Sequence, residues 1–171
     1  MRHTLVMPNP EDFPVIFRPF LSTPVYDSSC SPDARVIFLQ RDGGLYLKSA
    51  GAGTLRLEAE MDAYFASLRL GPEVMDYRTG EKDWLLTRAV PGEDCLYRQY
   101  IDDPERICDT TAELLRRLHD TDFTGCPVLD RTGDYIATVT ENYRLGKWDE
   151  SLFPDNWGYR SAEEAWAVVQ E

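Results

Sequence analysis

The amino-acid sequence predicts an α+β fold in which a strand-rich first part is followed by a helix-rich second part. Residues 36–48 and 74–87 each place apolar runs on both sides of turn residues, the pattern of a β-hairpin. Residues 55–69 and 104–119 instead repeat apolar side chains every three or four positions, as amphipathic helices do. Because 43% of the 171 residues are apolar, the chain can fill one sizeable domain or two small lobes.

The first hairpin turns at Arg41-Asp42-Gly43-Gly44, where Asp-Gly and Gly-Gly supply the positive φ angles of a tight connection. Strand alternation places Tyr46 and Lys48 on one face of the second strand, with Leu45 and Leu47 on the other.

The elements before this turn are less regular. Residues 10–21 are rich in apolar side chains but contain two prolines, so we expect a short helix or an irregular segment there. Residues 24–30 and 35–40 have the composition of strands and are joined around Ser31-Pro32-Asp33.

The later elements begin and end at recognisable signals. Gly71-Pro72 ends the helix at 55–69, and Pro91-Gly92 ends the second hairpin. Asp103 and Pro104 are a good N-cap and first residue for the helix that reaches His119. Weaker helical patterns cover 134–145 and 161–170, the latter opened by a capping box at its first residue.

Lys48 is the candidate for chemistry, because an ammonium group among apolar strand residues is costly unless an anion meets it. A carboxylate from the following helix or a bound phosphate would serve, and so would water reached by a flexible side chain. Glu58 and Glu60 lie at nearly equal angles on either flank of the helix's apolar stripe, so geometry alone does not choose between them.

Charge and composition exclude several function classes. The net charge is −12, and residues 101–171 carry 7 basic and 16 acidic side chains, a net of −9. Such a chain repels nucleic acid, and an acidic second half suits a polycationic small molecule or simply a soluble surface. No run of eighteen apolar residues and no signal peptide is present, so we expect a cytoplasmic protein without membrane contact. The four cysteines are too scattered for a zinc site and fit a reducing compartment.

The order of elements resembles the small lobe, hinge and first large-lobe helices of a kinase-like fold. The resemblance is closest to the aminoglycoside 3′-phosphotransferases, and three segments carry it in the right order. These are Leu45-Tyr46-Leu47-Lys48, the hinge-like Trp84-Leu85-Leu86-Thr87-Arg88-Ala89-Val90-Pro91-Gly92, and Leu115-Arg116-Arg117-Leu118-His119 with Cys126-Pro127. The stretch from Gly146 to Gly158 is similar, more loosely, to the family's acidic substrate loop.

The resemblance implies a small lobe at 1–88, a hinge at 89–93 and a partial large lobe at 94–171. It implies that Lys48 contacts the phosphates of ATP or GTP and that Glu60 holds Lys48 in place. Tyr46 would stack on the adenine, unless it is an ordinary core tyrosine of the sheet.

The hinge would read the adenine through the Arg88 carbonyl and the Val90 N–H group. The loop around Ser31 would cover the phosphates, although a plain surface turn explains that loop equally well. Asp149, Glu150 and Asp155 would bind the ammonium groups of an aminoglycoside, unless they are solvated loop charges.

The catalytic loop of the family, His-x-Asp-x-x-x-x-Asn, does not occur in this sequence. His119-Asp120-Thr121-Asp122 lacks the spacing, and His119 better suits the end of its helix. The aspartate that orients the hydroxyl and the second aspartate that holds Mg²⁺ would both follow Glu171, so we expect this chain alone to be inactive.

Three interpretations therefore remain. The chain is a shortened part of an antibiotic-resistance kinase, a non-catalytic nucleotide-binding or interaction module, or an unrelated α+β binding domain. In the first case, the loss of most of the large lobe should leave apolar helix faces uncovered near 107–118 and 162–169. Exposed patches of that kind favour self-association.

Overall fold

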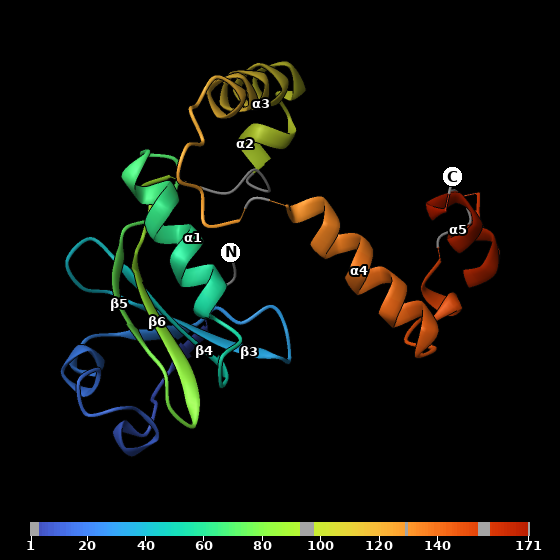
Figure 1. Cartoon of the computed structure of the whole chain (residues 1–171). Helices are drawn as coiled ribbons and strands as arrows, with labels where there is room; N and C mark the ends of the chain where they lie inside the picture. The colour runs from blue at the N-terminus through green and yellow to red at the C-terminus, as the bar shows by residue number, and fades with distance from the viewer. Residues whose placement is uncertain (1–3, 93–97, 129, 154–157, 171) are drawn as a thin grey trace. The chain divides into compact units, whose positions relative to one another are not determined.

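The computed structural model describes residues 4–92, 98–128, 130–153 and 158–170. The chain forms two compact units, Met1–Pro127 and Val128–Glu171. The first unit contains a sheet with one long helix beside it and two further helices later in the chain (Figure 1). The second unit is helical.

The sheet is antiparallel throughout, with strand order β1-β2-β3-β4-β6-β5 (Figure 1). The predicted α+β architecture of a kinase-like small lobe is confirmed, including both hairpins. The strands are β1 Thr4–Val6, β2 Val25–Asp27, β3 Ala34–Leu39, β4 Leu45–Gly51, β5 Val74–Arg78 and β6 Lys82–Arg88.

The helices of the first unit are α1 Arg56–Ser67, α2 Arg98–Ile101 and α3 Pro104–His119, and those of the second are α4 Arg131–Arg144 and α5 Ala162–Val169. Short 3-10 turns occupy Pro10–Asp12, Arg18–Ser22 and Glu150–Leu152. The irregular segment expected before the first hairpin is therefore two such turns. In the described part of the chain, no helix is long and apolar enough to cross a bilayer.

The two faces of β4 differ as strand alternation predicts. Leu45 and Leu47 are buried, whereas Tyr46 and Lys48 are half-buried. The buried pair joins a core with Phe13 and Phe17 from the segment before β2. The opposite face carries Lys48 and is covered by α1 (Figure 1). Lys48 lies inside β4 and not at its end, because the strand continues for three more residues.

The turn before β4 depends on its glycines. Asp42, Gly43 and Gly44 all have positive φ, and the Gly44 N–H donates to the Arg41 carbonyl at 2.7 Å. A Cβ on Gly44 would lie 2.8 Å from the ring of Phe38. Gly44 thus provides both the backbone geometry and the space in which Phe38 packs.

The segment after α3 returns to α1. Phe123 meets Phe65 edge to face, with ring centroids 6.5 Å apart. The buried Tyr64 hydroxyl has no hydrogen-bond partner among the described residues, and burial together with nearby Cys126 and Asp122 raises the pKa of Tyr64. The Cys-Pro segment that carried part of the family resemblance therefore packs against the helix beside the sheet.

The second unit is organised around three aromatic rings. Tyr143 stacks on Trp148 with centroids 5.1 Å apart, and on Trp166 at 4.6 Å. Ser161 caps α5 by accepting from the Glu164 N–H at 3.2 Å, as predicted. The Glu164 carboxylate accepts from the Arg160 N–H and not from that of Ser161, so the capping box is displaced by one residue.

Candidate functional site

Lys48 sits in the middle of the sheet face that α1 covers. Its cross-strand neighbours are Val36 on β3 and Leu85 on β6. Leu85 is buried, and the Lys48 side chain is 29% exposed. The apolar neighbours confirm that the stem of the lysine is enclosed, so its ammonium group requires an anionic partner.

Glu58 on α1 provides that partner. The Lys48 ammonium nitrogen lies 2.8 Å from Glu58 Oε1 and 2.7 Å from Oε2. The pairing of Lys48 with Glu60 is wrong for this structure, because the Glu60 carboxylate binds Arg56 at 2.7 Å, one helical turn earlier. Glu60 therefore points along the helix surface and does not reach the lysine.

The orientation of α1 explains why Glu58, and not Glu60, reaches Lys48. Leu57, an apolar residue of the first turn of α1, is 36% exposed and is not part of the buried face. The residues that face the sheet are Leu55 and Ala59, which are buried. This rotation brings Glu58, which precedes Ala59, towards Lys48 and turns Glu60 away.

A second carboxylate, Asp62, lies one helical turn after Glu58. Burial and the negative charge of Glu58 raise the pKa of Asp62, and the charge of Lys48 partly opposes them. Two acids on α1 thus share the field of one ammonium group. The sequence signal was an acid four residues after Glu58, the spacing at which helix side chains are neighbours.

Asp83 anchors the beginning of α1 to the sheet. It is fully buried, and its Oδ2 accepts from the Leu55 N–H at 2.9 Å and from the Tyr77 hydroxyl at 3.0 Å. Its Oδ1 accepts from the Thr79 hydroxyl at 2.8 Å. Although burial raises the pKa of Asp83, the hydrogen bonds from Gly53, Leu55, Thr79 and Tyr77 together lower it to about 2.

Sequence reasoning did not single out Asp83. The available signal was an aspartate inside an apolar strand, a position in which a carboxylate needs several donors to be buried.

Tyr46 belongs to a row of aromatic rings on the same face as Lys48. Its ring lies 5.1 Å from that of Phe38, which in turn lies 6.2 Å from the ring of Tyr26. Tyr46 is half-buried, and burial raises the pKa of its hydroxyl. The rings are tilted to one another by 44° and 53° and form an aromatic patch on the Lys48 side of the sheet.

The loop between β2 and β3 is tied to β3, the strand next to the one that carries Lys48. The Ser29 hydroxyl accepts from the N–H group of Val36 at 2.9 Å, and Val36 is the cross-strand neighbour of Lys48. Ser31 closes its own turn by accepting from the Asp33 N–H at 3.2 Å. The loop is thus bonded to β3, one strand away from Lys48, and the Ser31 hydroxyl is used within the turn.

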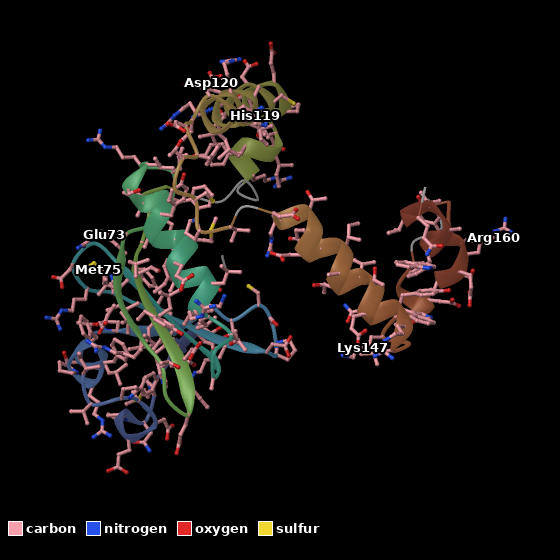
Figure 2. The ribbon with its side chains drawn as sticks, in the orientation of Figure 1. Glu73, Met75, His119, Asp120, Lys147 and Arg160 are labelled. Atoms are coloured by element: carbon pink, nitrogen blue, oxygen red, sulfur yellow. The ribbon has the colours of Figure 1, made fainter. Side chains whose placement is uncertain are left out.

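Arg88 ends β6 at the predicted hinge. Its guanidinium binds Glu73 at 2.7 Å, Met75 Sδ at 3.5 Å and the Asp42 carbonyl at 3.3 Å (Figure 2 labels Glu73 and Met75). Val90 is 65% exposed. The side chain of Arg88 therefore ties β6 to β5 and to the turn before β4, whereas Val90 faces solvent.

The acids of the second unit have structural contacts. Asp149 caps the following 3-10 turn through the N–H and hydroxyl of Ser151. Glu150 accepts from the Ala162 N–H at 2.7 Å, at the start of α5. Asp155 lies outside the described residues.

The described residues do not contain a group of three or more histidine, cysteine, aspartate or glutamate side chains placed to hold a metal ion. Cys30, Cys108 and Cys126 are free thiols, and Cys95 lies outside the described residues. His119 and Asp120 lie at the end of α3 (Figure 2), where the Asp120 N–H donates to the Arg116 carbonyl.

Comparison with known proteins connects this geometry to a family. A family model described as the phosphotransferase enzyme family, APH, matches residues 32–171. A probable aminoglycoside 3′-phosphotransferase of Lactococcus lactis is 38% identical over 164 residues, which are 95% of this chain and 62% of that protein. An aminoglycoside 3′-phosphotransferase of Escherichia coli is 28% identical over 86% of this chain and 54% of its own length.

Solved structures show the same fold. The crystal structure of an aminoglycoside-3′-phosphotransferase of type VIII superposes with a TM-score of 0.67 at 25% identity, over 84% of this chain and 55% of that one. The aminoglycoside phosphotransferase APH(3″)-Id from Streptomyces rimosus has a TM-score of 0.64 at 20% identity, over 83% of this chain and 53% of that one.

The chain spans between about half and two thirds of the length of these relatives, a share consistent with an N-terminal portion. The family model covers most of the sequence, and the kinase-like fold agrees with it. The chain therefore belongs to the phosphotransferase enzyme family, with aminoglycoside phosphotransferases among its relatives.

Proposed function

We propose that this chain is the nucleotide-binding part of a kinase that transfers the γ-phosphoryl group of ATP to a hydroxyl of an aminoglycoside. The observation that carries the proposal is the Lys48–Glu58 pair, an ammonium group held by both oxygens of a helix carboxylate on a sheet face. In kinase-like enzymes such a pair places the ammonium group against nucleotide phosphates.

The neighbours of the pair support a nucleotide as its ligand. The aromatic row at Tyr46 offers a stacking surface for a purine. The loop at Ser29 and Ser31 is bonded to β3, the neighbour of the lysine strand, and from there it would cover the phosphates. Arg88 and Val90, at the end of β6, would supply the backbone groups that bind the adenine edge.

We expect the Lys48–Glu58 ion pair to remain when a nucleotide binds. The Glu58 carboxylate fixes the ammonium position, and the remaining N–H donor of Lys48 is available to phosphate oxygens. ATP and GTP both satisfy this contact, since it involves phosphate and not the base.

We further propose that the 171-residue chain alone does not transfer phosphate. The sequence contains no His-x-Asp-x-x-x-x-Asn loop, the loop whose aspartate accepts the proton of the substrate hydroxyl in kinase-like enzymes. Incubation with ATP and kanamycin should give no phosphorylated product by mass spectrometry, and measurable product would contradict this proposal.

A second candidate function is a non-catalytic nucleotide-binding or interaction module, favoured by the same missing loop. Both candidate functions include the nucleotide site. They differ in whether additional sequence is needed to make a complete, active enzyme. The Lactococcus relative is 38% identical to this chain over 62% of its own length. Addition of the remaining part of that relative should restore phosphorylation of kanamycin if the first candidate holds. Failure to restore it in a soluble fusion would favour the second candidate.

Thermal unfolding with ATP and with adenosine tests the nucleotide site directly. A ligand that binds the folded state raises the midpoint, so ATP should raise it more than adenosine at equal concentration. Lys48→Met, which keeps the length of the side chain but removes its charge, should abolish the difference. Equal shifts by ATP and adenosine in the wild-type chain would reject a phosphate-binding role for Lys48.

For the second unit, we propose that Asp149, Glu150 and Asp155 attract the ammonium groups of an aminoglycoside in the complete enzyme. The uneven charge supports this, since residues 101–171 carry 16 acidic side chains against 7 basic ones. We also propose a cytoplasmic location and self-association of the isolated chain through uncovered helix faces.

A further inference from the structure

We infer that Asp83 is a positioning residue, which fixes the first turn of α1 so that Glu58 meets Lys48. The inference concerns the geometry of the ion pair, and its consequence for nucleotide affinity rests on the function proposed above. Asp83 touches neither Lys48 nor Glu58 through any hydrogen bond that the structure shows, so its action is indirect.

The carboxylate of Asp83 connects three separate segments. It binds the backbone N–H of Leu55 before α1, the hydroxyl of Tyr77 on β5 and the hydroxyl of Thr79 in the β5–β6 turn. Asp83 itself is on β6 and is completely buried. A buried acid with hydrogen bonds on both oxygens holds its partners in one arrangement, because the loss of any partner leaves buried polar groups unpaired.

The start of α1 has no cap of its own. Leu55 occupies the N-cap position without a side-chain hydrogen bond. Thr54, the nearest hydroxyl, instead donates to the Gly51 carbonyl at 2.7 Å. The first N–H groups of a helix need acceptors, and here Asp83 supplies one from 28 residues away. A carboxylate at this end also interacts favourably with the helix dipole.

Glu58 belongs to the same first turn that Asp83 holds. The Ala59 N–H donates to the Leu55 carbonyl at 2.9 Å, so Leu55 and Glu58 are fixed within one hydrogen-bonded turn. On the sheet, Asp83 lies two residues from Leu85, the cross-strand neighbour of Lys48. The same helical turn is thus attached to β6 through Asp83 and to β4 through Lys48.

This arrangement accounts for the choice of Glu58 over Glu60. With Leu55 anchored on Asp83, the residue three positions later faces β4, whereas Glu60 is two residues further round the helix. If Asp83 were replaced, α1 would lose the contact that sets its rotation. The apolar side chains of Leu55 and Ala59 would still favour burial of that face of the helix. A role in general stability alone would lower the unfolding free energy without displacing the ion pair.

The lysines of this chain allow the two roles to be separated. There are three, Lys48, Lys82 and Lys147, so ¹³C labelling of lysine at Cε gives three side-chain NMR signals that single Lys→Arg variants assign. The wild-type Lys48 signal should be distinct from the other two, and Glu58→Gln should move it. Asp83→Asn should move the Lys48 signal in the same direction while the Lys82 and Lys147 signals stay in place.

Leu86→Val is the matched control. Leu86 is the third residue after Asp83 on the same strand, is buried like it, and packs into the core on the opposite face. It should lower stability without moving the Lys48 signal. Should Asp83→Asn not fold, Tyr77→Phe removes one donor to the same carboxylate oxygen and should give a smaller shift in the same direction. The inference is overturned if the folded Asp83→Asn or Tyr77→Phe chain keeps the Lys48 signal at its wild-type position. It is also overturned if Leu86→Val displaces the Lys48 signal as far as Asp83→Asn does.

Nucleotide titration gives the functional arm. Asp83→Asn should weaken ATP binding by roughly three- to tenfold, the size expected for the loss of one well-placed ion pair. In the Glu58→Gln background, Asp83→Asn should have no further effect, because the residue through which it acts is already changed. If the wild-type chain does not bind ATP, the proposed function fails while the lysine signals still decide the role of Asp83.

Discussion

The ammonium group of Lys48 on β4 lies within hydrogen-bond distance of both carboxylate oxygens of Glu58 on α1, at 2.8 and 2.7 Å. The side chains are 29% and 39% exposed, so the pair is only partly screened from water. An exposed pair of this kind contributes about 1 kcal/mol or less to stability. Its importance is therefore the position of the ammonium group and not the energy of the pair.

The acid sensitivity of the chain should depend on Asp83. Its pKa is lowered to about 2 in the folded state, whereas an unfolded aspartate titrates at about 4. The folded state therefore gains stability from ionised Asp83 above pH 4, and loses that gain as the pH falls towards 2. Urea unfolding followed from pH 5 to pH 2 should show this loss in the wild type.

The Asp83→Asn chain separates this contribution from those of other acids. The pKa values of Asp27 and Asp122 are also lowered, by hydrogen bonds from Ser29 and Thr124, so some acid sensitivity should persist in the variant. The difference in unfolding free energy between wild type and variant should shrink between pH 4 and pH 2. A difference that stays constant over this range would show that Asp83 is not ionised in the folded state.

Gly44→Ala should destabilise the chain more than Gly43→Ala. Both positions have positive φ, at 105° and 87°, but only at Gly44 would the new Cβ meet a neighbour, 2.8 Å from the Phe38 ring. We expect a loss of about 1 kcal/mol at Gly43 from the backbone, and roughly 1–3 kcal/mol more at Gly44 from overpacking. Gly80→Ala, with open space and no positive φ, is the neutral control in chemical denaturation. Equal losses at Gly43 and Gly44 would mean that Phe38 moves aside freely.

The strand faces and the cap of α3 were predictable because their signals are local. Alternation alone places Lys48 opposite Leu47, and Asp103 accepts from the Arg106 N–H at 3.1 Å as an N-cap should. β1 was not predicted, since Thr4–Val6 is a strand through pairing with β2, about twenty residues later. The choice between Glu58 and Glu60 was not predictable either, because the rotation of α1 depends on Asp83, far along the sequence.

The division of the chain at 1–88, 89–93 and 94–171 stays a prediction. The compact units divide at Pro127 instead, since the segment after α3 packs on α1 through Phe123 and Phe65. Residues 93–97, which include the end of the predicted hinge, lie outside the described residues. Lobes defined by function and units defined by packing need not coincide.

Glu150 should have a structural role that can be separated from its charge. Glu150→Gln keeps an oxygen for the Ala162 N–H, whereas Glu150→Ala removes it. Glu150→Ala should therefore destabilise α5 by about 1 kcal/mol, seen as faster hydrogen exchange at residues 162–165, and Glu150→Gln should not. Fast exchange in both variants would mean that the charge, and not the hydrogen bond, holds the helix end.

The isolated chain should self-associate through α3. Leu114 and Leu115 on this helix are 54% and 48% exposed, and none of its side chains is buried in the structure. Light scattering should show a molar mass that rises with concentration, and the Leu114→Glu, Leu115→Glu double variant should reduce the rise. Met7→Gln, at an exposed position away from α3, serves as the control. A monomeric wild type at high concentration would reject this prediction.

The central claim, that the Lys48–Glu58 pair forms the phosphate site, is tested most directly by calorimetric titration of ATP into two matched variants. Glu58→Gln removes the charge that holds Lys48, and Glu60→Gln makes the same change two residues later at an acid that binds Arg56. We expect ATP affinity to fall roughly three- to tenfold in Glu58→Gln and to stay within about twofold in Glu60→Gln. A loss in Glu60→Gln with none in Glu58→Gln would contradict the account.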